Sequence, residues 1–336
     1  MKGVGEEQGL QILHVVQGFP PEFIGGTEFY CQALTRALQE RGHKCSVLAG
    51  SNQRAREPAL VTTDEEGICV TRYVSPLPPE WREKQIDPYN CEAELLVRKH
   101  LETVRPDVIH VHHWLRLTNS IVSLAAELGI PAIVTLHDLW TSCARVHRQH
   151  RLGHFCQESP SPSLCYSCVE RLPWQGDAEV RQAIDLRQEQ IARELRLARC
   201  LLVPSEPHRQ FLSRLLDISP DHMWVVPHGS IMRLRPNTNN EYPRFPRRPL
   251  RLAHWGHLVD FKGVHLILEA TKQLKDPSAV EVYLAGLAPD GWYIKYLQGL
   301  AEGLSVTFTG KYRPADLARL DAVSYTHLTL PTKRIV

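Results

Sequence analysis

The sequence lacks the features that mark membrane-spanning, secreted and nucleic-acid-binding proteins. No window approaches the roughly 18 uncharged apolar residues that a membrane span needs. The first residues, Met1 to Glu7, contain no apolar stretch of the kind that a signal peptide has. The formal net charge is only +2, so the chain has no overall attraction to nucleic acid. These absences favour a cytoplasmic protein without a nucleic-acid partner.

Cysteine is too sparse for a disulfide-stabilised scaffold. The 336 residues contain nine cysteines, and five of these stand alone in the sequence. Such spacing argues against the dense disulfide framework of small secreted domains. We interpret the isolated cysteines as small buried hydrophobic residues. They are Cys31, Cys45, Cys69, Cys91 and Cys200.

The apolar pattern predicts an α/β protein with parallel sheets. Short apolar segments such as 12–16 and 132–136 alternate with segments of helical spacing. Alternation of this kind is typical of a parallel sheet with helices on both faces. A stretch rich in Pro, Asn and Arg, residues 227–249, interrupts the pattern, which then restarts at residue 250. The interruption predicts a boundary between two Rossmann-like domains.

We therefore expect an N-terminal domain at residues 1–228, with a cysteine-rich insertion at 142–169, and a C-terminal domain at 229–323. The pattern stops after Val323, and residues 324–336 complete no further unit. We interpret these last residues as a non-native tail on a second domain that is cut short, and we expect this shortened chain to be inactive. Arginines gather between residues 233 and 251, where they either meet phosphates or anionic lipid headgroups or form a charged linker.

Glycines follow three successive strands of the expected second domain. Gly256, Gly286 and Gly310 each stand at the carboxyl end of an apolar segment. Ligands of open α/β sheets bind at this edge, and glycine lets them approach the backbone closely. The three glycines therefore predict a ligand-binding edge.

Four passages at expected strand ends resemble the retaining glycosyltransferases of family four over residues 9–323. They are Gly25-Gly26-Thr27-Glu28, then Thr135-Leu136-His137-Asp138, then Val203-Pro204-Ser205-Glu206 with Val226-Pro227-His228-Gly229, and finally the segment GHLVDFKG at 256–263. The resemblance implies a GT-B fold, in which two Rossmann-like domains face each other across a cleft. It also implies transfer of a sugar from a nucleotide diphosphate-sugar to a hydroxyl acceptor, with retention of configuration.

The resemblance assigns roles to the residues of these passages. Gly25 and Gly26 precede a helix, whose exposed N–H groups favour an anion. Lys262 would place a positive charge on the diphosphate of the leaving nucleotide. His257 stands where family members usually have an arginine, and His137 would contact the donor sugar. The plain structural alternatives are a turn at the glycines, an exposed lysine at a helix start, and a histidine bonded to a carbonyl.

The resemblance implies no cofactor for catalysis, because the family holds the diphosphate with protein charges and the sequence has no D-x-D metal motif. The family's pair of glutamates would lie beyond Val323. We expect the acceptor to be a glycan, a lipid-linked molecule or a small hydroxyl compound, in cell-surface glycan or glycoconjugate synthesis. Peripheral contact with the inner membrane face stays open.

A cluster of cysteines predicts a separate, structural metal site. Cys165 and Cys168 form a C-x-x-C pair, a spacing that lets two thiolates bind one tetrahedral ion, and Cys143 and Cys156 would complete four ligands. Zinc would stabilise a long polar loop that has no core of its own. An iron–sulfur cluster and unliganded thiols are the alternatives, and His147, His150 and His154 are substitute ligands.

The sequence is compatible with two other functions. One is another GT-B reaction on a nucleotide-sugar, such as epimerisation or hydrolysis. The other is a non-catalytic, metal-stabilised binding or scaffold protein, which the histidine at position 257 and the absent carboxylates both favour. A nicotinamide dehydrogenase is disfavoured, because no G-x-G-x-x-G follows the first strand.

Overall fold

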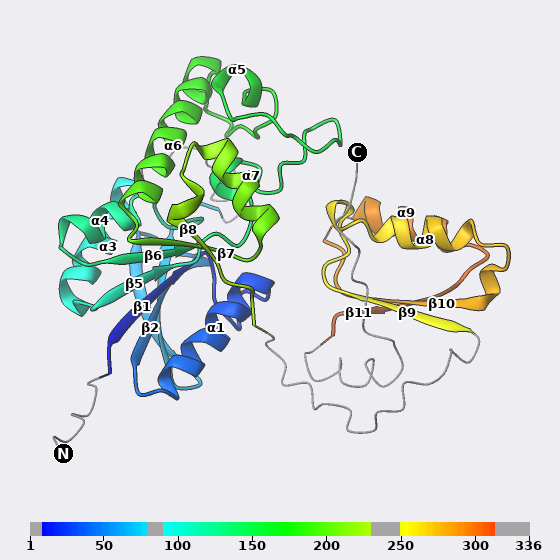
Figure 1. Cartoon of the computed structure of the whole chain (residues 1–336), viewed down its shortest axis with the longest axis horizontal. Coiled ribbons are helices and arrows are strands. Elements are labelled where there is room, and N and C mark those ends of the chain that lie inside the picture. The colour runs from blue at the N-terminus through cyan, green and yellow to red at the C-terminus, as the bar shows by residue number, and fades with distance from the viewer. Residues whose placement is uncertain (1–8, 79–89, 230–248, 290, 313–336) are drawn as a thin grey trace. The chain divides into compact units, whose positions relative to one another are not determined.

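The computed structural model describes residues 9–78, 90–229, 249–289 and 291–312. The chain divides into two compact units, Met1–Leu234 and Arg235–Val336. Each unit has its own sheet with helices packed against it (Figure 1). The expected tail at 324–336 and most of the Arg-rich stretch lie outside the described residues, so neither expectation is tested.

The N-terminal unit contains one eight-stranded sheet with the order β3-β4-β2-β1-β5-β6-β7-β8. All neighbours are parallel except β3 and β4. The strands are β1 Gln11–Val16, β2 Lys44–Arg54, β3 Ala59–Glu65, β4 Ile68–Ser75, β5 Val108–Val111, β6 Ala132–Thr135, β7 Cys200–Val203 and β8 Met223–Val225. The strand order reverses direction at β1, so β1 and β5 form the topological switch point where ligands of such sheets bind.

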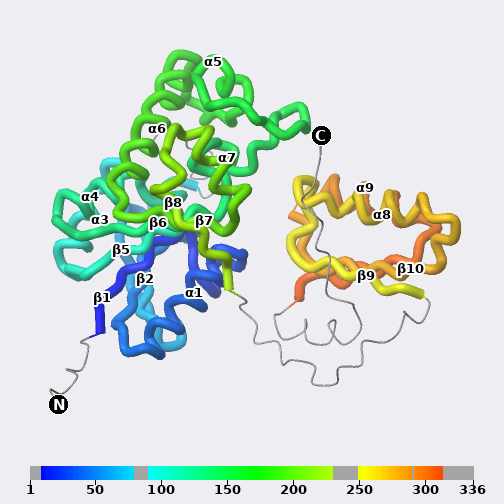
Figure 2. Tube along the Cα trace, viewed as in Figure 1, coloured from blue at the N-terminus to red at the C-terminus, as the bar shows by residue number. Residues whose placement is uncertain are grey.

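Both faces of this sheet are buried, as the apolar pattern predicts. Along β1, Leu13 and Val15 belong to the large core beneath one face, and Val16 belongs to a second core on the other. The tube in Figure 2 follows the chain through the helices that flank the sheet. These helices are α1 Gly26–Gln39, α3 Cys91–Val104, α4 Ile121–Glu127, α5 Pro162–Cys165, α6 Asp177–Leu197 and α7 Glu206–Leu216, with short 3-10 turns η1 Trp140–Ser142 and η2 Pro220–His222. Within the described residues, no helix combines the length and apolarity that crossing a bilayer requires.

The hairpin formed by β3 and β4 was not expected from the sequence. β3 reads ALVTTDE, and most of its side chains are exposed. An exposed edge strand needs no apolar alternation, so its sequence carries little strand signal. Its partner β4 is almost wholly buried and joins the sheet beside β2.

The isolated cysteines do not all behave as small buried hydrophobic residues. Cys31 and Cys45 are buried, Cys200 is half-buried, and Cys69 and Cys91 are exposed. The prediction was therefore wrong for Cys69 and Cys91. Cys69 lies in the strand β4 opposite an exposed edge strand, and Cys91 is the first residue of α3, where a side chain faces solvent.

The C-terminal unit has a three-stranded parallel sheet of order β11-β10-β9. Its elements are β9 Leu250–Trp255, η3 Asp260–Lys262, α8 Val264–Lys272, η4 Pro277–Ala279, β10 Val280–Ala285, α9 Gly291–Ala301 and β11 Ser305–Gly310. One core joins the sheet to α8 and α9 through Leu268, Leu284 and Leu297, all of which are fully buried. The predicted α/β class with parallel sheets is confirmed in this unit as well.

A buried carboxylate connects α6 to the start of α4. Glu194 is fully buried, and it accepts hydrogen bonds from the backbone N–H groups of Val122 and Ser123 at 2.6 and 2.8 Å. The Ser123 hydroxyl and the Trp114 indole N–H also donate to it, at 2.6 and 2.9 Å. Burial raises the pKa of Glu194, and these donors oppose that rise. This side chain therefore satisfies the exposed amides at the first turn of α4.

We expect Glu194→Ala to lower the free energy of unfolding by about 3 kcal/mol or more, because it leaves several buried donors without an acceptor. Urea unfolding followed by circular dichroism measures the change. Glu189→Ala, at an exposed position of the same helix, is the control and should shift the midpoint little. Equal midpoints for the two variants would contradict a stabilising role for Glu194.

Candidate functional site

The carboxyl edge of the N-terminal sheet brings together histidines that lie far apart in the sequence. His14 on β1 and His110 on β5 are register partners, so their side chains lie side by side. His112 follows directly after β5, and His137 follows two residues after β6. His228 comes three residues after β8. Parallel strands end at one edge of a sheet, which explains why these rings meet.

Four of these rings form a continuous hydrogen-bonded chain. His14 Nδ1 lies 3.1 Å from His112 Nε2, and His112 Nδ1 lies 3.0 Å from His137 Nε2. His137 Nδ1 in turn lies 3.1 Å from His228 Nε2. The chain begins in the core, where His14 is fully buried, and ends at the exposed His228. His110 stands beside the chain and bonds the Thr135 hydroxyl at 2.7 Å.

Burial keeps these imidazoles neutral. It lowers the pKa of His14 to about 3, with the neighbouring His110 adding to the effect. Burial lowers the pKa of His110 to about 4 and that of His137 to about 3. The pKa of His112 is also lowered by burial and by the surrounding rings. At neutral pH the edge of the sheet therefore offers hydrogen bonds and not positive charge.

Tyr30 of α1 covers the outer part of the histidine chain. Its ring centroid lies 5.0 Å from that of His137 and 4.7 Å from that of His228. Asp138, next to His137, accepts a hydrogen bond from the Trp140 amide at 2.8 Å, and its other oxygen lies 3.7 Å from His113 Nε2. Burial opposes ionisation of Asp138, but the contact with His113 outweighs it, so the pKa of Asp138 is lowered. The Tyr30 ring and the hydrogen bonds of Asp138 thus fix the loop that carries His137.

The Gly25–Gly26 loop lies at the start of α1, as the sequence predicts. Gly25 is the N-cap residue in an extended conformation, with no side chain capping the helix. A Cβ atom on Gly25 would come within 2.4 Å of the Glu28 carboxylate, whereas one on Gly26 would meet nothing within 4 Å. Glu28 is itself buried, and its Oε1 accepts from Gln17 Nε2 at 2.9 Å. The first turn of α1 therefore already holds one carboxylate beside Gly25.

In the C-terminal unit the predicted glycines form the edge of the sheet beside Lys262. Gly256, Gly286 and Gly310 have φ values of 141°, 150° and 70°, which side-chain-bearing residues rarely adopt. A Cβ atom on Gly286 would lie 1.7 Å from the Gly256 carbonyl oxygen, so only glycine fits there. The Gly286 amide donates to the Gly310 oxygen at 2.8 Å.

Lys262 lies at the end of η3 and reaches back to this edge. Its Nζ would be 3.5 Å from a Cβ atom on Gly256, so the ammonium stands directly beside the glycine backbone. His254 is close enough that burial and the Lys262 charge together lower its pKa. His257 is exposed on the loop between β9 and η3. The arrangement places one ammonium and open backbone next to each other, as an anionic ligand requires.

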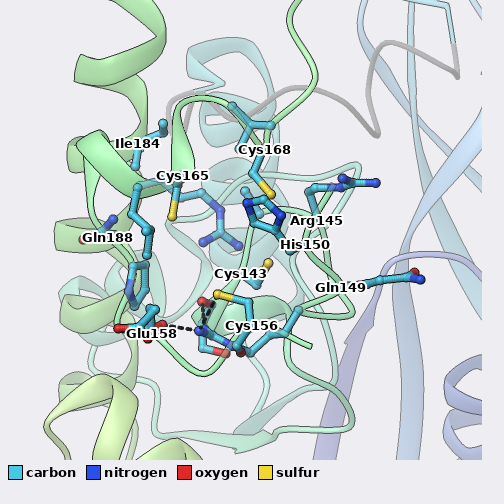
Figure 3. A pocket seen from close by; sticks show the side chains of 17 residues that line it. Cys143, Arg145, Gln149, His150, Cys156, Glu158, Cys165, Cys168, Ile184 and Gln188 are labelled. Atoms are coloured by element: carbon cyan, nitrogen blue, oxygen red, sulfur yellow. Dashed lines mark hydrogen bonds between the residues drawn. The ribbon is translucent and has the colours of Figure 1, made fainter. Parts of the chain in front are cut away.

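The four clustered cysteines line one pocket together with His150 (Figure 3). Cys143, Cys156, Cys165 and Cys168 come from different parts of the insertion, and their sulfur atoms turn toward the same space. The Arg151 amide donates to Cys168 Sγ at 3.4 Å, and Arg148 donates to Cys156 Sγ at 3.5 Å. All four thiols are half-buried and unbridged.

Two arginines are buried against this cysteine pocket. Arg148 is 2% exposed, and Arg187 is 5% exposed. Arg148 donates to the carbonyl oxygens of Ser142 and Cys156, and Arg187 donates to that of Trp140 at 2.6 Å. In the part of the chain that the structure describes, neither guanidinium forms an ion pair with a carboxylate. Burial lowers the pKa of Arg187 to about 10, and Cys143, Cys165 and Asp138 oppose that effect.

Outside the cysteine pocket, another group of potential metal ligands is closely spaced. Across the described residues, the set of three whose ligand atoms all lie within 4.8 Å of one another is His14, Cys31 and His112. The sulfur atoms of the cysteine pocket are spaced more widely. Burial strongly raises the pKa of the Cys31 thiol, so this side chain is a neutral neighbour of the histidine chain.

Sequence reasoning selected His137 but missed His14, His112 and His228 as its partners. His14 sits inside an apolar strand and reads there as an ordinary core residue. One signal was available: His110 and His112 alternate along a strand, which places both on the same face. Their pairing with His14 depends on strand order, which the sequence does not display.

The lowered histidine pKa values predict a loss of stability in mild acid. In the unfolded chain each histidine takes up a proton as the pH falls below about 6.5, whereas His14, His110 and His137 stay neutral in the folded chain until about pH 3–4. Protonation thus favours the unfolded state, and between pH 7.5 and 5.5 we expect a loss on the order of 3 kcal/mol. Urea midpoints across this range measure it.

Replacing the exposed His257 with Gln should leave this pH dependence unchanged. A urea midpoint that stays constant from pH 7.5 to 5.5 would show that the three buried rings do not control stability.

Comparisons with known proteins agree with this architecture. Residues 24–230 match the sequence profile of Glycosyltransferase Family 4. No curated protein matches the chain. Similar solved structures include a sucrose-phosphate synthase from Thermosynechococcus elongatus, with 17% identity, a TM-score of 0.58, and coverage of 94% of this chain and 74% of that one. An α,α-trehalose 6-phosphate synthase from Burkholderia multivorans has 13% identity, a TM-score of 0.56, and coverage of 92% and 74%.

A third similar structure is a trehalose-6-phosphate synthase described in a study of glycosyl transfer with retention, with 13% identity, a TM-score of 0.52, and coverage of 91% and 74%. These likenesses establish the fold, and the predicted GT-B class is confirmed. The family match covers more than half of the chain, including the Gly25–Gly26 loop, the histidine chain from His112 to His228, and the cysteine pocket. The chain belongs to glycosyltransferase family 4.

Proposed function

We propose that the protein transfers a sugar from a nucleotide diphosphate-sugar to a hydroxyl acceptor with retention of configuration. The observation that carries the proposal is the position of Lys262 Nζ beside the bare backbone of Gly256 at the carboxyl edge of a parallel sheet. Departure of a nucleotide diphosphate leaves negative charge on its oxygens, and a preorganised ammonium with open backbone stabilises that charge. Membership of a glycosyltransferase family supports the same reaction.

In this proposal the C-terminal unit holds the donor. Gly256, Gly286 and Gly310 let the diphosphate approach the ends of β9, β10 and β11, and Lys262 supplies the charge. His257, which is exposed on the adjoining loop, donates a further hydrogen bond where family members usually have an arginine. These protein groups provide the positive charge at the leaving oxygens, so the proposal requires no metal for catalysis.

The N-terminal unit supplies the acceptor side. The histidine chain and the Gly25–Gly26 loop stand at the switch point of its sheet, where a hydroxyl compound would bind. The neutral state of the rings suits contact with sugar hydroxyls. We propose a role in cell-surface glycan or glycoconjugate synthesis on the cytoplasmic side. The study of retention in a similar trehalose-6-phosphate synthase supports retention here.

Replacing Lys262 with Ala should weaken donor binding by about 10- to 100-fold, because a charge-assisted hydrogen bond contributes about 1.5–3 kcal/mol. Calorimetric titration of the full-length protein with UDP-, GDP- and ADP-glucose measures the dissociation constants. Lys272→Ala, at the exposed end of α8, is the matched control and should bind the donor like the wild type. An unchanged affinity in Lys262→Ala would remove Lys262 from the donor site.

Product analysis completes the test. Incubation of the donor with an acceptor extract should yield a glycoside of unchanged anomeric configuration. Donor consumption without an acceptor would instead indicate hydrolysis or epimerisation, and the absence of any consumption would favour a binding protein.

A further inference from the structure

The cysteine pocket is lined by two buried guanidinium groups and by four thiols. Arg148 and Arg187 are both almost fully buried, and neither has a carboxylate partner within the described residues. A buried guanidinium stays protonated and is costly without a nearby anion. Both arginines line the same pocket as Cys143, Cys156, Cys165 and Cys168. Thiolates held by a metal ion in this pocket would balance the charge of the two arginines.

We propose that Cys143, Cys156, Cys165 and Cys168 bind one structural zinc ion, whose charge Arg148 and Arg187 balance. A zinc ion with four thiolate ligands carries two net negative charges, and the pocket supplies two buried guanidinium groups. The N–H contacts from Arg148 and Arg151 to the sulfurs of Cys156 and Cys168 are the second-shell bonds that orient such ligands. The proposal does not depend on the activity proposed above.

Zinc would act by fixing the insertion. The segment from Cys143 to Val169 contains one four-residue helix, α5, and an isolated bridge between Gln149 and Phe155. In the bound site each sulfur would lie about 2.3 Å from the ion, and the four bonds would tie together distant parts of the loop. Cys143 ends η1, whose Trp140 carbonyl oxygen accepts from Arg187. The ion would therefore also brace the loop that carries His137 and Asp138.

Metal analysis of the purified full chain tests this site. We expect about one zinc per chain, released by a thiol-modifying reagent, and tetrahedral thiolate bands after replacement with cobalt(II). Cys165→Ser and Cys168→Ser should lose the ion, whereas Cys69→Ser, which alters an exposed cysteine outside the pocket, should keep it. Arg187→Met should weaken zinc affinity by about 10- to 100-fold, as loss of an outer-shell partner does.

Several results would overturn the zinc site. They are a chain that neither contains nor takes up zinc, iron with acid-labile sulfide in place of zinc, and alkylation patterns that show disulfides among the four cysteines. Retention of zinc in a variant that lacks both Cys165 and Cys168 would also exclude these ligands.

The hydrogen bonds of the histidine chain can run in only two directions, and the structure distinguishes between them independently of the cysteine pocket. Each neutral imidazole has one N–H, and each link joins Nδ1 of one ring to Nε2 of the next. All rings must therefore carry the proton on Nδ1, or all must carry it on Nε2. The buried end decides between the two, because His14 Nε2 has no hydrogen-bond partner.

A buried N–H without an acceptor is rarer in proteins than an unused lone pair. His14 thus carries its proton on Nδ1 and donates outward to His112, which donates to His137, which donates to His228. Both ring nitrogens of His137 then form hydrogen bonds to other rings of the histidine chain.

We infer that the histidine chain fixes the tautomer of His137 and leaves Nδ1–H of His228 as the outward hydrogen-bond donor. Under the proposed function, that N–H would bind an oxygen of the sugar or acceptor. His228 is exposed, and the Tyr30 ring lies 4.7 Å from it, so its orientation is constrained while one edge stays open.

Nitrogen-15 NMR of labelled histidines tests the direction of the chain without any substrate. We expect His137 and His228 to be Nδ1–H tautomers in the wild type and also in His14→Leu, because the buried Nε2 of His112 then becomes the atom without a partner. His14→Asn, whose amide N–H can replace Nδ1–H, should preserve the wild-type tautomers. His110→Asn is the control, since His110 bonds Thr135 and lies outside the chain.

Nε2–H tautomers of His137 or His228 in the wild type would overturn the inference. So would stoichiometric metal that His14→Leu removes. On active enzyme, His228→Leu should lower kcat/KM about 10-fold, with partial recovery in His228→Asn. If the tautomers are as expected but no sugar is transferred by the wild type, the proposed function fails while the direction of the chain stands.

Discussion

The N-terminal unit depends on keeping imidazole rings neutral at the carboxyl edge of its sheet. Four linked histidines stand where a Rossmann-like sheet receives its ligand, and burial lowers the pKa of each, to about 3 for His14 and His137. One added proton would place a charge beside several other rings in a poorly solvated environment. The edge therefore acts through hydrogen bonds, and the direction that we infer for them follows from the unpartnered nitrogen at the buried end.

The charged side chains of the protein differ in their surroundings, and these surroundings decide their roles. Lys262 stands at an exposed glycine-lined edge, where an ammonium can meet a diphosphate and remain partly hydrated. Arg148 and Arg187 are buried beside thiols, where a guanidinium requires a fixed counter-charge. Glu194 is buried among amide and hydroxyl donors, so its role is structural. A charged side chain that is exposed can bind a ligand, whereas one that is buried among hydrogen-bond partners has a structural role.

Much of the fold could be predicted from the sequence because buried parallel strands are continuous apolar runs. Segments such as 12–16 and 132–136 were expected as strands and form β1 and β6. The exposed hairpin strand β3 was missed, because it buries little and shows no apolar alternation. The exposure of Cys69 and Cys91 was also missed, since a single residue's exposure depends on which strand or helix covers it.

The sequence by itself determined the α/β class, the strand-end glycines and the gathering of cysteines within one insertion, because each of these follows from local pattern and spacing. His137 was selected by its resemblance to a family motif. Tertiary structure alone decided that His14, His112 and His228 join His137, and that Arg148 and Arg187 face the cysteines. The reason is physical: strand order and helix packing bring together residues up to 214 positions apart, counted from His14 to His228. No local propensity encodes such contacts.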